Sequence, residues 1–210
     1  MAGGGQVFVV DDDEAIRDSL DALLGASGFD VCCFGSPVEF LAWLKPERAG
    51  CLLVDVRMPE MSGLDLQKAV TAAYPGVSIV MMTGHADVPM AVAAMKAGAV
   101  DFIEKPFAPD ALLKAVQRAM AQSDTQGRAA AERELHVARL SSLSTRERQV
   151  LSGLVAGEPN KVIAHKLQIS PRTVEIYRAR LMDKMQARSL SELVRAAVIA
   201  GVTPDEGDVR

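Results

Sequence analysis

Acidic residues stand where short apolar runs end, and these acids are the residues of the sequence best suited to chemistry. Asp11 and Asp12 follow the run Val7–Val10, and Asp55 follows Cys51–Val54. If both runs are strands of one parallel sheet, the acids meet at one edge of that sheet. Crowded carboxylates repel one another unless a cation joins them, and a few hard oxygen ligands completed by water suit Mg²⁺. The sequence therefore predicts a magnesium site at this edge.

Two further polar residues complete a set that could transfer a phosphoryl group. Thr83 follows the apolar run Val77–Met82, and Lys105 stands just beyond Val100–Ile103. The set then holds a carboxylate nucleophile, a metal ion and two donors for developing charge. An Asp after a strand is by itself more often a turn or helix cap, so the joint placement at four strand ends carries the prediction.

The elements that would position these residues alternate along the first part of the chain. Short, β-branched apolar runs predict strands at residues 7–10, 30–34, 51–54, 77–82 and 100–103. Apolar residues at helical spacing predict helices at about 14–27, 36–45, 63–74, 87–97 and 109–121. Almost wholly apolar strands that alternate with helices form a parallel sheet covered on both faces. The predicted fold is α/β, a doubly wound five-stranded parallel sheet.

Beyond this part the signals are helical. Residues 123–127 read as a break and residues 125–142 as a partly helical linker. Helices are predicted at Thr145–Ala156, Asn160–Leu167, Pro171–Met185 and Ser191–Ala200, followed by a loose tail at 202–210. We therefore predict an α/β domain at 1–124, a linker at 125–142 and a small all-α domain at 143–210.

Charge and composition narrow the class of protein. Residues 1–124 hold 9 Lys and Arg against 17 Asp and Glu, whereas residues 143–210 hold 11 against 8, which predicts two partners of opposite charge character. With 49% hydrophobic residues the chain can build packed cores, which excludes wholesale disorder. No run approaches the roughly 18 apolar residues of a membrane span, no signal peptide is evident, and three cysteines in apolar runs make no disulfide framework. We expect a cytoplasmic protein with no membrane partner.

The stretch Leu167–Val174 predicts an abrupt new helix after a short turn. Ser170 suits the N-cap and Pro171 suits the first helical position. A short helix, such a turn and a longer helix form a helix-turn-helix. The residues predicted to face inward from the longer helix are Val174, Leu181 and Met185.

The opposite face of this longer helix could enter the major groove of DNA. It carries Glu175, Ile176 and Ala179, flanked by the cations Arg172, Arg178, Arg180 and Lys184. The cations would neutralise phosphates while the middle residues meet base edges. The alternative is a helical hairpin with a solvated basic face.

Ten residues of the first part match a known pattern in order and spacing: Asp11, Asp12, Asp55, Met58, Pro59, Gly63, Thr83, Phe102, Lys105 and Pro106. With them, residues 6–122 resemble the flavodoxin-like receiver domain of two-component response regulators. The stretch 83–107 resembles the FixJ-type branch of that family.

This resemblance implies a phosphorylation site. Asp55 would accept a phosphoryl group from a phosphohistidine on a sensor histidine kinase. Mg²⁺ would be bound directly by Asp12, Asp55 and the backbone carbonyl of Arg57, with Asp11 acting through water.

The resemblance also implies a switch. Thr83 and Lys105 would contact the phosphoryl oxygens, and Phe102 would swing inward when Thr83 moves. A phosphoryl group adds charge and strong acceptors, enough to reposition a loop. The region at 87–121 would then pair two copies into a homodimer.

The second part matches another pattern at Leu143–Leu151, Asn160–Ala164, Arg172–Glu175 and Ser189–Val194. Residues 143–201 are thereby similar to the LuxR/NarL-type DNA-binding domain, whose recognition helix would begin at Pro171. The resemblance implies DNA-backbone contacts at Lys161, Arg172 and Thr173, and base contacts at Glu175, Ile176 and Ala179. Tyr177 stands where many members have His.

Together these features predict a response regulator transcription factor that binds promoter DNA, with RNA polymerase as a further candidate partner, and not an enzyme beyond slow loss of its own phosphate. Two alternatives stay open. The helical part could bind a protein instead of DNA, making the chain a phospho-regulated adaptor. An aspartyl-phosphate phosphatase is the other, although Arg57 stands where such enzymes usually place a second catalytic Asp.

Overall fold

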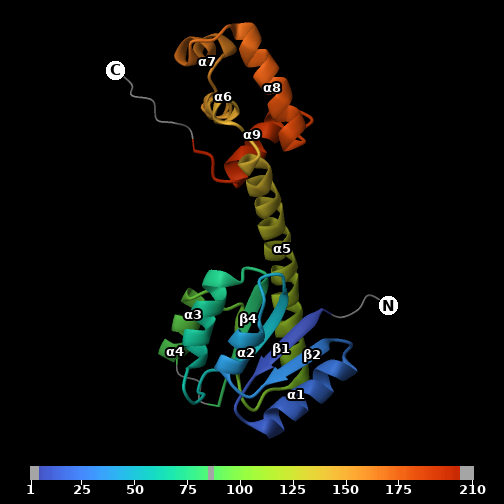
Figure 1. The fold of residues 1–210 in the computed structure, drawn as a ribbon. Helices are drawn as coiled ribbons and strands as arrows, with labels where there is room; N and C mark the ends of the chain where they lie inside the picture. The colour runs from blue at the N-terminus through green and yellow to red at the C-terminus, as the bar shows by residue number, and fades with distance from the viewer. Residues whose placement is uncertain (1–4, 85–87, 204–210) are drawn as a thin grey trace. The chain divides into compact units, whose positions relative to one another are not determined.

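Figure 1 shows the computed structural model, which describes residues 5–84 and 88–203. The chain divides into two compact units, Met1–Ala130 and Ala131–Arg210, and the boundary falls inside helix α5 (Pro109–Ser141). Among the described residues, two buried apolar clusters lie in the first unit and one lies in the second.

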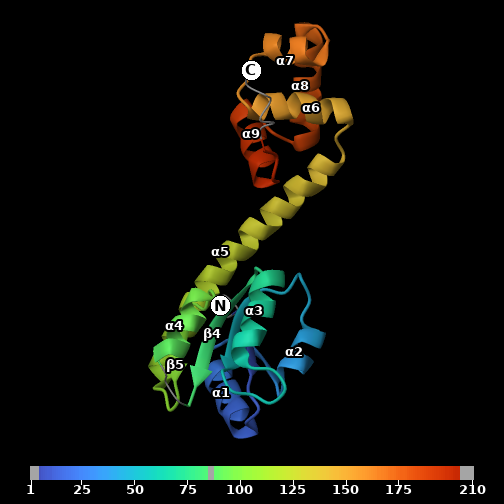
Figure 2. The ribbon, with the colours of Figure 1, turned by 90° about the vertical axis from the view of Figure 1, so that its left-hand side faces the viewer.

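The first unit is a parallel sheet with helices on both faces (Figure 2). Its strands are β1 (Gln6–Val10), β2 (Asp30–Phe34), β3 (Gly50–Asp55), β4 (Val77–Thr83) and β5 (Asp101–Glu104), in the order β2-β1-β3-β4-β5. Helices α1 (Glu14–Ala26) and α5 cover one face, and α2 (Pro37–Trp43), α3 (Gly63–Ala73) and α4 (Val88–Lys96) cover the other. The predicted fold class is confirmed, with each strand end within one residue of its prediction.

Strand register decides where the acidic residues lie. β1 pairs with both β2 and β3, and Val10 lies opposite Val54. The strands β1 and β3 therefore end side by side. The strand order reverses at this point, so the connections leave in opposite directions and open the crevice where open α/β sheets bind their ligands.

Helix α5 is longer than predicted. The break predicted at 123–127 is absent, and the helix continues to Ser141. Ser123 is buried and donates its hydroxyl to the Gly76 carbonyl, while Gly127 lies close to Ala49. These tertiary contacts hold the segment helical against its weak local propensity, and the alanines that follow are strong helix formers.

The second unit contains the end of α5 and the helices α6 (Thr145–Val155), α7 (Asn160–Leu167), α8 (Pro171–Met185) and α9 (Leu190–Ile199). Each helix lies within a residue of its predicted bounds. The predicted loose tail begins too early, because Val202 packs on the core and its amide donates to the Ala197 carbonyl. Residues 204–210 lie outside the described residues.

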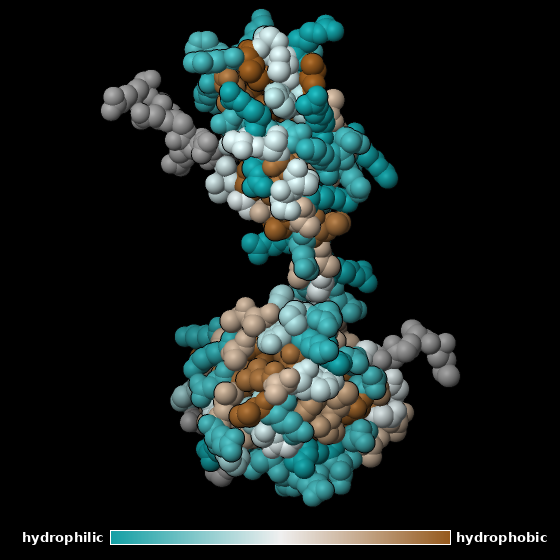
Figure 3. All heavy atoms as spheres, in the orientation of Figure 1, coloured by the Kyte–Doolittle hydropathy of each residue, from teal (hydrophilic) through white to brown (hydrophobic). Residues whose placement is uncertain are grey.

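The surface carries small apolar patches among hydrophilic residues. Figure 3 shows apolar atoms at the end of the second unit formed by α7 and α8. Val162 of α7 and Ile176 of α8 are exposed apolar side chains. Within the described ranges no helix is long and apolar enough to cross a membrane. Of the cysteines, Cys51 is buried, whereas Cys33 is exposed on the edge strand β2.

Candidate functional sites: a carboxylate edge and a helix-turn-helix

Three of the predicted site residues meet at the edge formed by the ends of β1, β3 and β5. Lys105 Nζ lies 2.6 Å from Asp11 Oδ2 and 2.7 Å from Asp55 Oδ1. The other oxygen of Asp55, Oδ2, accepts a hydrogen bond of 2.6 Å from the amide of Arg57. Both oxygens of the Asp55 carboxylate are therefore held in place.

The expected crowding of three carboxylates is not what the structure contains. Asp11 and Asp55 are buried and share the ammonium group of Lys105, whereas Asp12 is exposed. In the part of the chain that is described, no three His, Cys, Asp or Glu side chains are placed to hold a metal ion together. The cation that joins the two buried acids here is Lys105.

The donor set nevertheless has the chemistry of a magnesium site. Mg²⁺ is commonly bound by one or two carboxylates while it keeps several waters. Asp11 and Asp55 supply two carboxylates at the mouth of the crevice, and Asp12 adds an exposed third nearby in the chain. The residues present therefore fit a partly hydrated divalent ion.

Burial and pairing set the charges of this edge. Burial raises the pKa of Asp11, and its hydrogen bond from Lys105 only partly opposes that shift. Burial pulls the pKa of Lys105 downward, but the hydrogen bonds to Asp11 and Asp55 together with their negative charges outweigh burial, and the pKa rises overall. Lys105 is therefore a firmly charged ammonium that faces the Asp55 carboxylate.

Gly63 allows the chain to close tightly behind Asp55. Its amide donates to the Val56 carbonyl, and a Cβ placed on Gly63 would lie 2.1 Å from the Asp55 carbonyl oxygen. Ser62 caps α3 by accepting from the amide of Asp65. A glycine is required here by close approach, because any side chain would collide with the β3 backbone.

Thr83 and Phe102 lie on the adjacent strands β4 and β5. Thr83 is buried at the end of β4, and its carbonyl accepts from the amide of Lys105. Phe102 is half-buried against the core. The predicted start of the following helix at residue 87 lies outside the described residues, and the described α4 begins at Val88.

Arg17 is a residue of this edge that the sequence analysis missed. Its Nη1 donates to the Asp11 carbonyl at 2.7 Å, while Asp11 Oδ1 accepts from the amide of Asp13. Asp13 caps α1, accepting from the amide of Ala15. The signal available in the sequence was a single cation one turn into a helix that starts among four acids.

The second site is the helix-turn-helix of α7 and α8. Gln168 adopts a left-handed conformation and ends α7, and Ser170 caps α8 by accepting from the amide of Thr173. Pro171 stands in the first turn, where a missing amide proton costs nothing. As predicted, the inward residues Val174, Leu181 and Met185 are buried.

The opposite face of α8 is open to solvent. The exposed residues are Arg172, Glu175, Ile176, Ala179 and Arg180, and Lys161 is exposed on α7. Thr173 is half-buried, with its hydroxyl 2.8 Å from that of Ser170. A ready-made helix face with flanking cations is therefore free to meet a groove.

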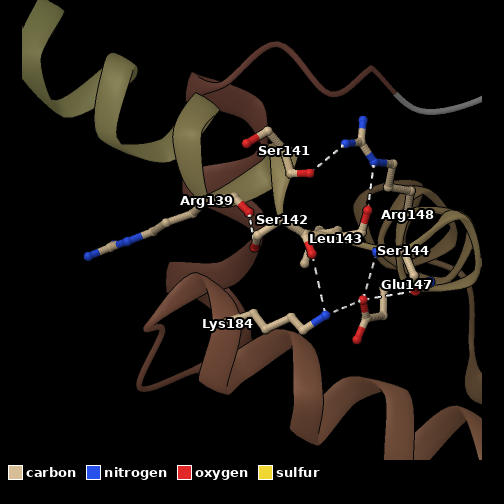
Figure 4. Close-up of polar contacts among 8 residues, drawn as sticks. All are labelled: Arg139, Ser141, Ser142, Leu143, Ser144, Glu147, Arg148 and Lys184. Carbon is tan, nitrogen blue, oxygen red and sulfur yellow. Dashed lines mark hydrogen bonds and ion pairs between the residues drawn. The ribbon is translucent and has the colours of Figure 1, made fainter.

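Two of the four cations predicted to neutralise phosphates bind acceptors within the second unit. Arg178 is half-buried and donates to the side-chain oxygen of Asn160, and Lys184 forms an ion pair of 2.7 Å with the buried Glu147 (Figure 4). Arg180 instead lies over the ring of Tyr177 at 6.0 Å. The sequence prediction for Arg178 and Lys184 overlooked these internal acceptors.

Comparison with known proteins assigns both units. The family model of the response regulator receiver domain matches residues 7–117, and that of the bacterial regulatory proteins of the luxR family matches residues 141–197. The chain is 49% identical to the transcriptional regulatory protein FixJ of Bradyrhizobium diazoefficiens, covering 98% of this chain and 100% of that protein. The chain belongs to the FixJ-type response regulators.

Other relatives agree with this assignment. The FixJ protein of Rhizobium meliloti is 48% identical, covering 94% of this response regulator and 97% of that protein. Among solved structures, full-length FixJ from B. japonicum matches with 49% identity and a TM-score of 0.57, covering 96% and 100% of the two chains. The response regulator StyR matches with 42% identity and a TM-score of 0.77, covering 93% and 99%.

These findings establish a response regulator transcription factor, with a receiver domain and a LuxR-type DNA-binding domain in one chain. The match to the luxR family favours DNA over protein as the partner of the second unit. The FixJ relatives of this chain are named transcriptional regulatory proteins, not phosphatases.

Proposed function

We propose that a sensor histidine kinase phosphorylates this response regulator on Asp55 and that the phosphoryl group controls binding of promoter DNA by α8. The observation that carries the proposal is the buried carboxylate of Asp55, held between the Lys105 ammonium and the Arg57 amide. A carboxylate oxygen attacks the phosphorus, the bond to the donor histidine breaks, and an acyl phosphate forms.

The neighbouring residues have distinct roles in this proposal. Lys105 already balances the charge of Asp55 and would pair with a phosphoryl oxygen once that oxygen is present. Asp11, Asp12, Asp55 and the Arg57 carbonyl would hold Mg²⁺, which would neutralise charge on the phosphoryl oxygens.

Thr83 and Phe102 would form the switch. The hydroxyl of Thr83 is drawn to the phosphoryl group, and the half-buried ring of Phe102 moves inward as β4 and β5 adjust. Support comes from their placement on paired strands, where Thr83 lies opposite Glu104.

The face formed by α4, β5 and the start of α5 would pair two copies. On α4 the side chains of Val88, Met95 and Val92 are exposed by 76%, 46% and 46%, whereas Met90 packs against the core. Apolar side chains that the fold leaves in water favour contact with a second apolar surface. We infer that phosphorylation drives a homodimer through this face.

The dimer would place two copies of α8 on a two-fold promoter site, which multiplies a modest single-site affinity. Lys161, Arg172 and Thr173 would contact the DNA backbone, and Glu175, Ile176 and Ala179 would meet the bases. RNA polymerase is then a partner at the promoter. In this role the chain acts in the cytoplasm and turns over no substrate, apart from slow loss of its own phosphoryl group.

The proposal is tested by phosphorylation in solution. The full-length chain is incubated with acetyl phosphate and Mg²⁺, and its molecular mass and affinity for a duplex selected from random sequence are measured. We expect dimerisation and at least tenfold tighter binding for the wild type, neither for Asp55→Asn, and wild-type behaviour for the control Asp65→Asn, whose carboxylate is exposed. A response of Asp55→Asn equal to that of the wild type would overturn the assignment.

A further inference from the structure

The C-terminal end of α8 is fastened to the segment that joins α5 to α6. Arg139, near the end of α5, donates from Nη1 to the Met185 carbonyl at 3.2 Å and from Nη2 to the side-chain oxygen of Gln186. Lys184, in the last turn of α8, donates to Glu147 Oε2 at 2.7 Å. Arg139 thus reaches from α5 to the end of α8, and Lys184 reaches from α8 to the start of α6.

A third contact strengthens this junction. Lys184 Nζ also lies 3.4 Å from the Ser142 carbonyl (Figure 4). We call the whole set the terminal clasp; it consists of Arg139, Ser142, Glu147, Lys184, Met185 and Gln186.

Glu147 fixes the clasp to the start of α6. Its side chain is 5% exposed, and Oε2 accepts from the amide and the hydroxyl of Ser144 as well as from Lys184. Ser144 in turn accepts from the Glu147 amide, which completes a capping box. The Lys184 side chain, itself 38% exposed, therefore reaches a carboxylate that the start of α6 holds in place.

The connecting loop is held by a second arginine. Arg148 donates from Nε to the Leu143 carbonyl at 3.2 Å and from Nη2 to the Ser141 carbonyl at 3.3 Å. With the Ser142 carbonyl bonded to Lys184, three successive carbonyls, from the last residue of α5 onward, are paired with cations, which is favourable at the negative end of a helix. The loop is therefore a fixed support for α8.

We propose that Arg139 and Lys184 are positioning residues for DNA recognition, which set the direction of α8 from its C-terminal end and contact no phosphate. The inference rests on the proposed function of α8. Ile176 and Met185 are nine residues apart, about 14 Å along a helix. A tilt of about 5° at the clasp would shift the base-facing residues by about 1 Å, enough to spoil base contacts.

Salt dependence separates a positioning residue from a phosphate contact. Loss of one phosphate contact weakens binding to every sequence and reduces the slope of log K against log salt by about 0.9. Loss of a positioning residue weakens binding to the preferred sequence alone and leaves that slope unchanged, because no counterion release is lost.

The experiment uses the full-length chain and two probes. The first probe is the 30-base-pair duplex that the wild type enriches most from a random pool, and the second is the unselected pool itself. We expect Arg139→Ala and Lys184→Met each to weaken binding to the selected duplex by about tenfold. Binding to the pool should stay within about twofold and the salt slope should not change.

Matched variants complete the test. Arg172→Ala, at an exposed cation of α8 assigned to the DNA backbone, should weaken both probes and lower the slope. Lys184→Arg keeps the ion pair with Glu147 and should restore selectivity. Gln186→Ala removes only the exposed acceptor of Arg139. It therefore tests the role of Arg139 even if Arg139→Ala does not fold.

Each remaining outcome decides against the proposal. Equal weakening on both probes with a lower slope would make Arg139 or Lys184 a phosphate contact. Unchanged affinity for the selected duplex in Arg139→Ala, Gln186→Ala and Lys184→Met would mean that the clasp positions nothing. If the wild type enriches no duplex at all, the proposed function is wrong, and the inference about the terminal clasp is wrong as well.

Discussion

Lys105 Nζ lies 2.7 Å from Asp55 Oδ1, although the two residues are fifty positions apart in the chain. The ammonium group simultaneously contacts the buried Asp11, so one cation balances two carboxylates. In the receiver unit, one side chain therefore contributes both to the proposed phosphorylation site and to the stability of the fold.

Replacing Lys105 by Met should slow phosphorylation and lower the free energy of unfolding of the first unit. Two buried carboxylates would be left without their partner, which costs about 2–3 kcal/mol of the free energy of unfolding. Trp43 is the only tryptophan and lies in the first unit, so urea unfolding followed by its fluorescence reports on this unit. The control Lys68→Met breaks an exposed ion pair with Asp65 and should cost at most about 1 kcal/mol. Equal losses in the two variants would contradict the account.

Gly63→Ala should disturb the support behind Asp55. The new methyl group would lie 2.1 Å from the Asp55 carbonyl oxygen, so β3 or the start of α3 must move. We expect a loss of about 2 kcal/mol and slower phosphorylation by acetyl phosphate. Gly25→Ala, in α1 with open space around it, should instead stabilise the unit by about 0.5–1 kcal/mol. Normal phosphorylation of Gly63→Ala would show that the close approach is not needed.

Arg17→Met should release the Asp11 backbone at the end of β1. With the hydrogen bond of 2.7 Å to the Asp11 carbonyl gone, the acidic loop is less well ordered for a divalent ion. The Mg²⁺ concentration at half-maximal phosphorylation rate should rise several-fold. Arg48→Met, which removes a cation stacked on Trp43, serves as control and should leave that concentration unchanged. An unaltered Mg²⁺ requirement in Arg17→Met would refute this role.

Glu147 should make the second unit acid-sensitive. The hydrogen bond from Lys184, followed by that from the Ser144 amide, lowers the pKa of Glu147 from 4.5 to about 2. Since the folded pKa lies below the unfolded one, the stabilisation is complete above pH 4.5 and is lost as pH falls toward 2.

Hydrogen exchange of α6 and α8 amides in the full-length chain measures this effect. Compared at equal pH, Glu147→Gln should exchange faster than the wild type at pH 6, and the difference should shrink below pH 4.5. Glu134→Gln, at an exposed position of α5, should match the wild type throughout. A difference that is constant from pH 6 to pH 2.5 would show that ionisation of Glu147 contributes nothing.

Much of the fold could be predicted because hydrophobic periodicity and helix capping depend on residues that are close together in the chain. Alternation of apolar runs with helical patterns predicted five parallel strands and their ranges, and Ser170 with Pro171 marked the start of α8. The course of α5 could not be predicted, since the hydroxyl of Ser123 finds its acceptor at Gly76, far away in sequence. Local propensity there is overruled by tertiary contact.

The candidate sites, too, could be predicted only in part. Strand ends brought Asp11, Asp55 and Lys105 together as predicted, because parallel strands end at one edge. The internal pairing of Lys184 could not be seen, since helical periodicity identifies an outward face but not the acceptor that a long side chain reaches. Glu147 reads in the sequence only as a helix-capping acid.

The location of the phosphoryl group tests the central claim most directly. The full-length chain is incubated with acetyl phosphate and Mg²⁺, the acyl phosphate is reduced with borohydride, and the peptides are sequenced by mass spectrometry. We predict homoserine in place of aspartate at position 55 and at no other acid. An unmodified Asp55, or a label at Asp11 or Asp12 instead, would contradict the account.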